Sequence, residues 1–480
     1  MTIAKVRVRT QDGGLRATRT TTRYPAVVGC SSGGTAATPV LIATSADAVS
    51  AFGYGRLTEL IALYLDLAGV PVLACKAATA TAGASGSVSQ DGTGTATMTV
   101  TDQTAADDYS VYVKVTRAGG SLAAAAAAVK VSYDGGVTYG DELAVPTSGV
   151  LSLPEGSLEV TWADGTFVAG DVYRFTTTRP AWDSTGLSAA LDALKAAGVV
   201  DHEFIHVAEP CTAVHAAIVK TYLEGLESSG VYRRALLGAR DQNSGESVST
   251  WMTVLAGGSP GFGLFDAEFF MDVCCSHIDL KYRIAKGTFR RNGAYVIGPR
   301  LAWMRTRVDE VFRGLAEHPG QTRVDGRSWA IPGVEKLHHD LRFLEALDTA
   351  RLMGLQTHHG VDGYFPTDRS MALPSSDFRT VMNARVIVEA ATQAQLLLTA
   401  YVAERLRLAA GGVIDARDAE ALDGQMTGDF LAVMAPYCSS ASLTIDRAAD
   451  LTGGRLPGAI KVRPFGYATD IDFSLGFTRE

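Results

Sequence analysis

The sequence predicts an α/β (α+β) core domain with an inserted all-β, sandwich-like domain and strand-forming arms at the N- and C-termini. Tyr24–Gly29 and Val70–Cys75 are short, continuous apolar runs, and the helical pattern Leu57–Leu67 lies between them. Buried strands that alternate with helices are typical of α/β sheets. Short strand-like runs with turn residues then fill residues 79–178, and helical patterns return after Asp183. This order favours one domain inserted into another.

Composition bounds the size and class of the protein. A chain of 480 residues is long enough for two to four domains. A net charge of −8 disfavours a general nucleic-acid binder. No apolar run approaches the roughly 20 residues that span a bilayer. The first residues, MTIAKVRVRT, lack the apolar stretch of a secretory signal. We therefore expect neither direct nucleic-acid binding nor membrane insertion.

Both ends of the chain show the period-2 pattern of half-buried β-strands. Apolar residues alternate with lysine and arginine near the N-terminus, and with polar residues or glycine near the C-terminus. The apolar positions are Ala4, Val6, Val8, Ile471, Phe473, Leu475 and Phe477. A terminal strand needs a sheet edge to pair with, in its own subunit or in a neighbour. The residue pattern leaves both possibilities open.

The composition changes near Ala77, and alternating segments separated by turns follow. Asp134–Gly136 and Asp164–Gly165 are typical hairpin turns. The six-alanine run Ala123–Ala128 has helical propensity but lies between strands, so its structure stays open. The expected strands are Thr95–Thr101, Tyr109–Thr116, Val129–Tyr133, Gly149–Leu153, Ser157–Trp162 and Asp171–Thr177.

The last 300 residues return to mixed helices and strands. Gly411–Gly412 end the longest helical pattern, Ser376–Ala410, which would measure about 50 Å at ~1.5 Å per residue. Pro299 is expected at the start of another helix. The remaining expected helices are Leu187–Ala197, Ala213–Leu226, Pro299–Ala316 and Ala416–Met434, and the expected strands are His202–Val207, Ala294–Ile297 and Ala441–Ile445.

Nucleophile and cofactor motifs are weak in this sequence. Gly29–Gly33 (GCSSG) fits the G-x-S-x-G pattern of a nucleophilic serine, Ser31. That motif requires a helix directly after the serine, whereas Gly34, Thr35 and Pro39 indicate a loop. No phosphate-binding loop occurs, and the glycine-rich stretch at 257–263 lacks the context of a dinucleotide site. We therefore predict no catalytic residues and no cofactor.

Histidines and cysteines leave a metal site open but do not favour it. The pairs His338–His339 and His358–His359 have aspartates nearby, at positions 340, 362 and 368. Structural histidines are the more common case. Cys274, Cys275 and His277 form a second combination, but adjacent cysteines rarely bind one ion together. We predict no metal, and buried free thiols for all six cysteines.

A basic run with interleaved aromatic residues occupies residues 281–307. A solvated surface is its ordinary explanation, and a docking surface for an acidic protein partner is the functional alternative. The candidates for such docking contacts are Arg283, Lys286, Arg290 and Arg291.

Gly360–Arg385 (GVDGYFPTDRSMALPSSDFRTVMNAR) resembles the signature region of contractile tail sheath proteins of tailed phages and contractile injection systems. Pro39–Ile42, Ala46–Gly53 and the following helix and strand are similar to the N-terminal part of that family. Val129–Gly136 and Phe167–Phe175 resemble the β domain of one branch. The matching signature positions are Tyr364, Asp368, Arg369, Met371, Ala372, Ser376, Asp377, Phe378, Arg379, Asn383, Arg385 and Val386.

The resemblance implies a non-enzymatic structural subunit of the virion tail, assembled in the host cytoplasm. Such subunits stack as hexameric rings around an inner tail tube protein, and contraction drives the tube through a target envelope. Terminal strands reach into adjacent subunits, and baseplate and tail terminator proteins are further partners. The implied divisions are an N-terminal arm (1–22), a discontinuous core (23–78 and 179–458), the inserted β domain (79–178) and a C-terminal strand-exchange arm (459–480).

Two other functions remain as alternatives. One is a serine or metal-dependent hydrolase that uses Ser31 or the histidine pairs. The other is a different self-assembling virion protein built on similar strand exchange.

Overall fold

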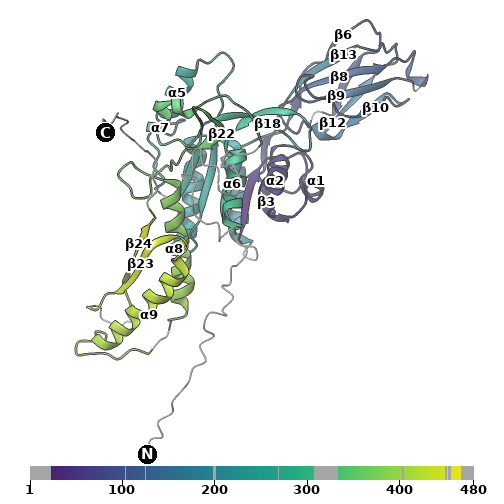
Figure 1. Ribbon diagram of the computed structural model, residues 1–480. Coiled ribbons are helices and arrows are strands. Elements are labelled where there is room, and N and C mark those ends of the chain that lie inside the picture. Colours follow the sequence, from purple (N-terminus) through teal and green to yellow (C-terminus); the bar gives the residue numbers. More distant parts are fainter. Residues whose placement is uncertain are drawn as a thin grey trace, which may run out of the picture.

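The computed structural model describes residues 23–465, apart from 103, 125, 198–201, 269, 307–332, 403–404, 449–450, 452–453 and 455. A central α/β body lies between two projecting lobes (Figure 1). The β lobe, residues 84–178, projects at one end, and the helical lobe, residues 381–464, at the other (Figure 1). The alternating segments predicted around residues 4–8 and 471–477 lie outside the described residues.

A six-stranded sheet forms the centre of the body, in the order β17-β16-β15-β1-β3-β2. All of its strand pairs are parallel except β2–β3. The predicted strand–helix–strand unit is confirmed, since β1 pairs with β3 in parallel. The strands are β1 (Tyr24–Gly29), β2 (Val40–Ile42), β3 (Val72–Lys76), β15 (His202–Cys211), β16 (Arg234–Ala239) and β17 (Met271–Cys274).

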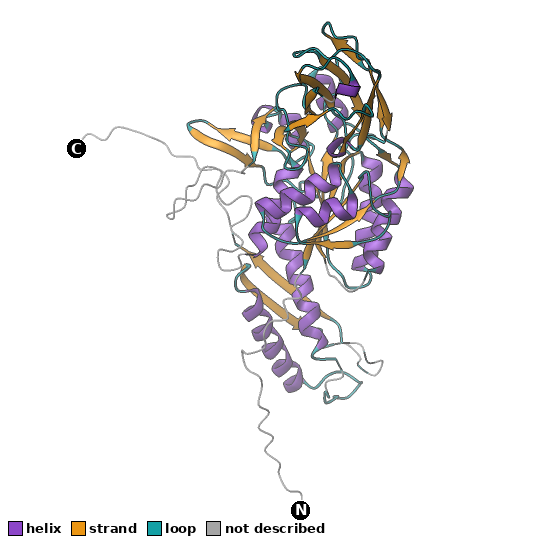
Figure 2. Cartoon of the chain, turned by 90° about the vertical axis from the view of Figure 1, so that its right-hand side faces the viewer, coloured by secondary structure: helices purple, strands orange, loops and turns teal. Residues whose placement is uncertain are grey.

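Helices cover both faces of this sheet, which explains why its strands are apolar throughout (Figure 2). Val27 and Ala74 pack toward one face, and Ala26 and Val28 toward the other. The first face carries α1 (Ser45–Phe52), α2 (Arg56–Leu67) and α6 (Ala294–Thr306). The second carries α3 (Ser184–Ala196), α4 (Ala213–Glu227), α5 (Val248–Ala256) and α7 (Glu345–Thr349).

The β lobe contains two antiparallel sheets whose inner faces bury Trp162, Phe167 and Tyr173. The six strands expected there are present, and β5, β6 and β10 are additions. Of the alanine run, Ala124 ends a short 3₁₀ turn and Ala128 begins β9. The strands are β5 (Ala84–Ser85), β6 (Ser89–Asp91), β7 (Met98–Asp102), β8 (Ser110–Arg117), β9 (Ala128–Ser132), β10 (Glu142–Ala144), β11 (Val150–Leu153), β12 (Leu158–Trp162) and β13 (Val172–Thr178).

The chain enters and leaves the β lobe through a two-stranded link. Strand β4 (Thr79–Thr81) pairs antiparallel with β14 (Ala181–Trp182). A second connection comes from the antiparallel sheet β19-β18-β20, formed by β18 (His277–Lys281), β19 (Thr288–Asn292) and β20 (Val334–Leu337). In this sheet, Phe289 contacts Tyr109 of the lobe, with ring centroids 5.5 Å apart.

The helical lobe packs two helices against a two-stranded sheet (Figure 1). Helices α8 (Val381–Thr399) and α9 (Ala416–Met434) cover β23 (Cys438–Ile445) and β24 (Gly458–Pro464). Phe430 and Met434 of α9 are fully buried there. The hairpin β21 (Leu355–His358) and β22 (Val361–Pro366) precedes the lobe in the chain. The expected bounds of α9 are confirmed.

The strand expected at Ala294–Ile297 is wrong, because these residues form the first turn of α6. The side-chain oxygen of Asn292 accepts a hydrogen bond from the amide of Ala294. The carbonyl of Gly293 accepts from the amides of Val296 and Ile297. Pro299 consequently lies inside the helix and not at its start. Short apolar runs fit a buried helix turn as well as a strand.

The helix expected over Ser376–Ala410 is also wrong in extent, since α8 has 19 residues. Thr380 is its N-cap and accepts from the amide of Asn383, whereas Ser376 belongs to a turn. Beyond the helix, Leu408 and Ile414 form an isolated β-bridge. Residues 459–464, expected in the C-terminal arm, belong to β24 and pair with β23.

Gly298 of α6 provides a test of the packing at the centre of the body. A Cβ at this position would lie 2.3 Å from Tyr64 Oη and 2.5 Å from His206 Nδ1. These two atoms share a buried hydrogen bond of 2.8 Å. We predict that Gly298→Ala lowers the free energy of unfolding by about 3 kcal/mol, through overpacking and loss of this bond.

The matched control is Gly424→Ala in α9, where an added Cβ meets nothing within 4 Å. There, alanine should stabilise by up to about 1 kcal/mol through helix propensity. Thermal unfolding followed by circular dichroism measures both variants. Equal effects of the two substitutions would contradict the packing described for α6.

Candidate functional site

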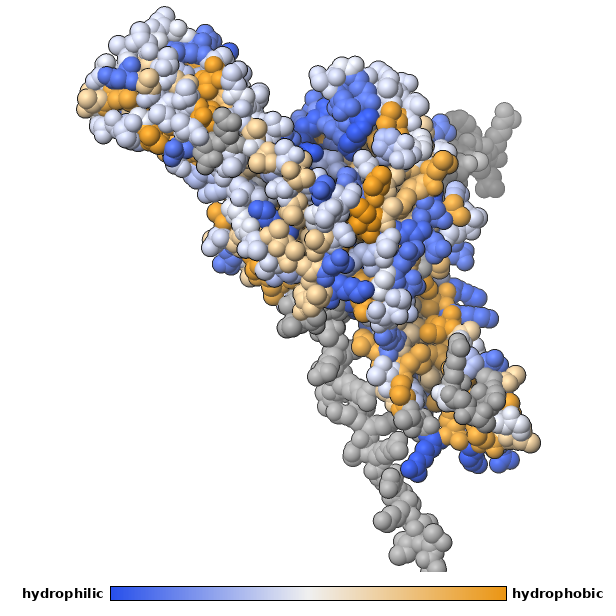
Figure 3. Space-filling model, turned by 180° about the vertical axis from the view of Figure 1, so that it is seen from behind, coloured by the Kyte–Doolittle hydropathy of each residue, from blue (hydrophilic) through white to orange (hydrophobic). Residues whose placement is uncertain are grey.

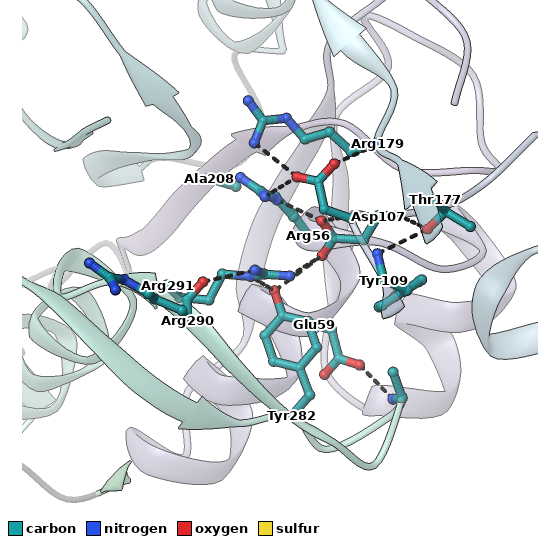
Figure 4. A network of polar contacts seen from close by, with 12 residues as sticks. Arg56, Glu59, Asp107, Tyr109, Thr177, Arg179, Ala208, Tyr282, Arg290 and Arg291 are labelled. Atoms are coloured by element: carbon teal, nitrogen blue, oxygen red, sulfur yellow. Dashed lines mark hydrogen bonds and ion pairs between the residues drawn. The ribbon is translucent and has the colours of Figure 1, made fainter. Parts of the chain in front are cut away.

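A buried ionic network joins the β lobe to the central body (Figure 4). At its centre is Asp107, which lies in the bend before β8 and has no exposed surface. Arg56, the first residue of α2, donates from Nε to Asp107 Oδ1 over 2.8 Å. Arg291 of β19 donates from Nη2 to Asp107 Oδ2 over 2.6 Å. One carboxylate of the lobe thus bridges two separate elements of the body.

The two arginines keep Asp107 ionised. Burial alone would raise the pKa of its carboxyl group, but the charges of Arg291 and Arg56 lower that pKa to about 2. Tyr282 Oη lies 3.4 Å from Asp107 Oδ2, and the Arg291 guanidinium stacks over the Tyr282 ring at 4.9 Å. A buried charge with two partners of opposite sign is expensive to separate from either of them.

The network continues outward through two further carboxylates. Arg56 Nη2 donates to Asp108 Oδ2 over 2.8 Å, and Arg56 Nη1 lies 3.6 Å from Glu209 Oε2. Arg179 Nε lies 3.4 Å from the same Glu209 oxygen. A polar cavity of about 340 Å³ opens here, lined by all four of these side chains. These contacts tie the lobe and the exit from it to helix α2 and strand β15.

Glu59, one turn into α2, forms a second link, between this helix and the loop that follows β18. Its carboxylate accepts from the backbone amides of Arg283, Ile284 and Ala285, at 3.1, 3.2 and 2.7 Å. These residues form the loop between β18 and β19. Burial raises the pKa of Glu59 to about 7, although the three amides act in the opposite direction. The side chain thus fixes this loop against the body.

The basic residues singled out in the sequence lie in different settings. Arg283 pairs with Asp66 at 2.9 Å and Lys286 with Asp141 at 3.6 Å, both on the surface. Arg290 Nε lies 2.5 Å from Asp241 Oδ2 and is half-exposed. Arg291 is buried in the network around Asp107. Its charge is therefore satisfied within the subunit, whereas the other three guanidinium or ammonium groups reach solvent.

The histidine pairs are not brought together. His338 Nε2 lies 2.6 Å from Asp279 Oδ1, while the ring of His339 stacks on Trp251 with centroids 4.2 Å apart. His358 packs near Phe365 in the β21–β22 hairpin. Asp340 Oδ2 accepts from Thr357, and Asp368 accepts from the amide of Met382. His339 instead meets His277 and Asp241.

The six cysteines are all described, buried and free. Burial raises the pKa of the Cys274 thiol to about 12, so it stays protonated at neutral pH. In the candidate nucleophile turn, the Ser31 hydroxyl donates to the carbonyl of Gly33 at 3.1 Å. The turn is followed by a loop, as expected from the sequence. Among the described helices, none combines the length and apolar character of a membrane span.

Sequence reasoning missed the network itself. Arg56, Glu59, Asp107, Glu209 and Asp241 were not singled out. The sequence pattern could have indicated two of them as buried charges. Glu59 interrupts the apolar helix LTELIALYL, and Glu209 follows the apolar run FIHVA. Charged residues within apolar runs are rarely buried without a partner. The identity of those partners requires the fold.

We predict that Asp107→Asn lowers the free energy of unfolding by about 3–5 kcal/mol, because it leaves the buried guanidinium of Arg291 without its carboxylate and removes one of the three carboxylates around Arg56. The control is Asp91→Asn, since Asp91 pairs with Arg174 at 2.7 Å on the exposed surface of the lobe. That change should cost about 1 kcal/mol or less. Thermal unfolding measures the loss of stability in both variants. Similar losses for the two variants would show that Asp107 does not hold the lobe.

Glu59 gives a pH-dependent prediction. Its pKa is raised in the folded protein, so the stability it contributes is complete below about pH 4.5 and is lost as the pH rises through about 7. Glutamine does not ionise, so the stability of Glu59→Gln does not fall with pH in this way. Between about pH 5 and pH 8 the variant should gain about 3 kcal/mol relative to the unmodified protein. Thermal midpoints at both pH values test this, with Glu420→Gln on the exposed side of α9 as control. A constant difference would contradict it.

Comparison with solved structures places the fold. The contracted helical sheath of the anti-feeding prophage is 11% identical to this chain, with a TM-score of 0.50, over 96% of this chain and 94% of that one. A chain of the contracted anti-feeding prophage baseplate is 11% identical, with a TM-score of 0.51. The match covers 94% of this chain and 92% of the baseplate chain. The sheath tail protein of Desulfitobacterium hafniense is 12% identical, with a TM-score of 0.43. The match covers 92% of this chain and 97% of that protein.

The resemblance to contractile sheath proteins seen in the sequence is thus confirmed at the level of the fold. The mixed α/β class is confirmed as well. A comparison with curated proteins found no significant match. A sequence model described as DUF2586, N-terminal domain, matches residues 3–276, which is more than half of the chain. The protein therefore belongs to the DUF2586 family.

Proposed function

We propose that this chain is a structural subunit of a contractile tail sheath. In this proposal, the subunits polymerise as stacked hexameric rings around an inner tube and contract to drive the tube through a target envelope. The observation that carries the proposal is the fold shared with a contracted helical sheath over 96% of the chain. The subunit would be located in the virion tail, assembled in the host cytoplasm, with baseplate and tail terminator proteins as further partners.

The sheet of the helical lobe is suited to strand addition. Within the described residues, β23 and β24 pair only with each other, so each has an outer edge without a partner strand. A two-stranded sheet is marginally stable alone and gains from further strands. Backbone hydrogen bonds give such an added strand a direction, and side-chain pockets set its register. We infer that terminal strands of neighbouring subunits pair with these edges.

Both ends of the described chain contact the same lobe. Arg23, the first described residue, pairs with Glu389 of α8 at 3.4 Å. Strand β24, whose end leads to the C-terminal segment, packs beside α8 through Val462. Figure 3 shows apolar side chains over this lobe, and Leu396, Leu408, Leu431 and Ile460 are exposed there. We infer that the exchange segment begins after Pro464, later than residue 459.

We further infer that residues 79–178 form an inserted domain that moves with the core as one rigid body. Asp107 and Glu59 support this inference, because they hold the lobe and the adjacent loop to α2 through buried contacts. A contracting lattice needs subunits that keep their shape while their contacts rearrange. Arg283, Lys286 and Arg290, which reach solvent, are the proposed charge contacts to the tube or to a neighbour.

The hydrolase alternative has less support. Ser31 lies in a turn and bonds to the carbonyl of Gly33, and no histidine contact to it is described. The alternative of another self-assembling virion protein keeps the same strand exchange, and the shape of the assembled particle distinguishes it.

The test uses the alternating pattern of the C-terminal segment. We predict that deletion of residues 470–480, or Phe473→Ala with Leu475→Ala, leaves a folded subunit that no longer forms tubes or stacked rings in negative-stain micrographs. Each lost apolar contact removes about 1.5–3 kcal/mol of burial per interface. Asp472→Ala with Ser474→Ala is the matched control on the opposite face, and it should assemble normally.

Two results would contradict this proposal. Normal tubes from the deletion variant would exclude the C-terminal segment as the link. A small, monodisperse oligomer of the unmodified protein that hydrolyses esters, and loses that activity in Ser31→Ala, would overturn the sheath function itself.

A further inference from the structure

Two histidines and one aspartate from separate segments converge beside the polar cavity. Asp241 follows β16, His277 begins β18, and His339 follows β20. One donor atom from each of them lies within 4.8 Å of the donor atoms of the other two. His339 Nε2 is 3.6 Å from Asp241 Oδ1. Among the described residues, no second group of histidine, cysteine and acidic side chains has donor atoms this close together.

The donor set and its spacing suit a transition metal. Two imidazoles and one carboxylate are typical ligands of Zn²⁺ and related ions. Ligand atoms at ~2.1 Å from a tetrahedral ion lie about 3.4 Å apart. The 3.6 Å between His339 and Asp241 needs only a small contraction to reach this value. Ca²⁺ and Mg²⁺ prefer sets made of oxygen atoms alone.

A positive charge already occupies the point where these groups meet. Arg290 donates from Nη2 to Asp241 Oδ1 over 2.8 Å, and its Nη2 lies 3.1 Å from His339 Nε2. A guanidinium group can only donate, so His339 Nε2 carries a lone pair directed toward the cation. The Arg290 side chain is 37% exposed and can leave toward solvent.

The surroundings hold both rings close to Asp241. His277 Nδ1 lies 3.6 Å from Asp241 Oδ1 and 3.1 Å from the Cys275 carbonyl. Because a carbonyl can only accept, this nitrogen carries a proton in the metal-free protein, and a bound ion takes the place of that proton. Trp251 stacks on His339 and holds it in place. Asp241 and His277 line the cavity of about 340 Å³, which gives water a route to open coordination positions.

We propose that Asp241, His277 and His339 bind a divalent transition metal ion of the Zn²⁺ class, which displaces the guanidinium group of Arg290. The ion connects the end of β16 in the central sheet to the sheet β19-β18-β20. It thereby reinforces the side of the body to which the β lobe is attached. This site does not depend on the sheath function, and its test is separate.

The experiment is calorimetric titration of ZnCl₂ into tag-free, full-length protein that has been treated with a chelator. We expect about one Zn²⁺ per chain. Arg290→Gln should bind about tenfold tighter or better, because no guanidinium has to be displaced. Asp241→Asn in the Arg290→Gln background should weaken binding by about 10–100-fold, the loss seen even for outer contacts of metal sites. Arg283→Gln, in the surface loop between β18 and β19, is the matched control with unchanged affinity.

Co²⁺ absorption spectra of the same variants provide a second readout, since visible bands report nitrogen and oxygen ligands directly. Circular dichroism confirms that each variant is folded, and Arg290→Gln changes only a half-exposed side chain. The proposal is overturned if neither the unmodified protein nor Arg290→Gln binds Zn²⁺. It is equally overturned if Asp241→Asn and His339→Gln bind as well as the unmodified protein.

Discussion

The buried carboxylate of Asp107 is the interaction on which the arrangement of the lobes depends. It belongs to the β lobe, but both of its guanidinium partners, Arg56 and Arg291, belong to the body. Such a triad contributes less to net stability than its short distances suggest, because three charges had to leave water. Its main effect is directional. A lobe that rotated away would leave at least one buried charge unpaired, so a single orientation is strongly favoured.

The central sheet explains why this network can lie so deep. Apolar strands covered by helices on both faces exclude water, and the few polar groups inside must find partners. Tyr64 and His206 pair with each other beneath α6, and Gly298 is required there because no Cβ fits. Glu59 finds its partners in three backbone amides. Each buried polar group thereby fixes one neighbouring segment in place.

The β lobe and the helical lobe differ in how their polar and apolar groups are satisfied. Buried ion pairs hold the junction with the β lobe, whereas the described strands of the helical lobe leave sheet edges without partners, and apolar side chains are exposed beside them. This combination suits the sheath subunit proposed above, whose copies must bind one another. The cluster of Asp241, His277 and His339 lies close to the same cavity as Glu209.

The sequence by itself determined the elements whose signal is local. Strand β1, helix α9 and most strands of the β lobe follow from period, turn residues and caps that lie within a few residues of each other. Tertiary structure decided the rest. The apolar start of α6 fits a strand equally well until Asn292 caps it. Helix α8 ends at Thr399, although the helical pattern of the sequence continues beyond it. Asp107 and Arg291 are 184 residues apart, so no local pattern could pair them. Only the fold supplies the low-polarity environment that makes their contact decisive.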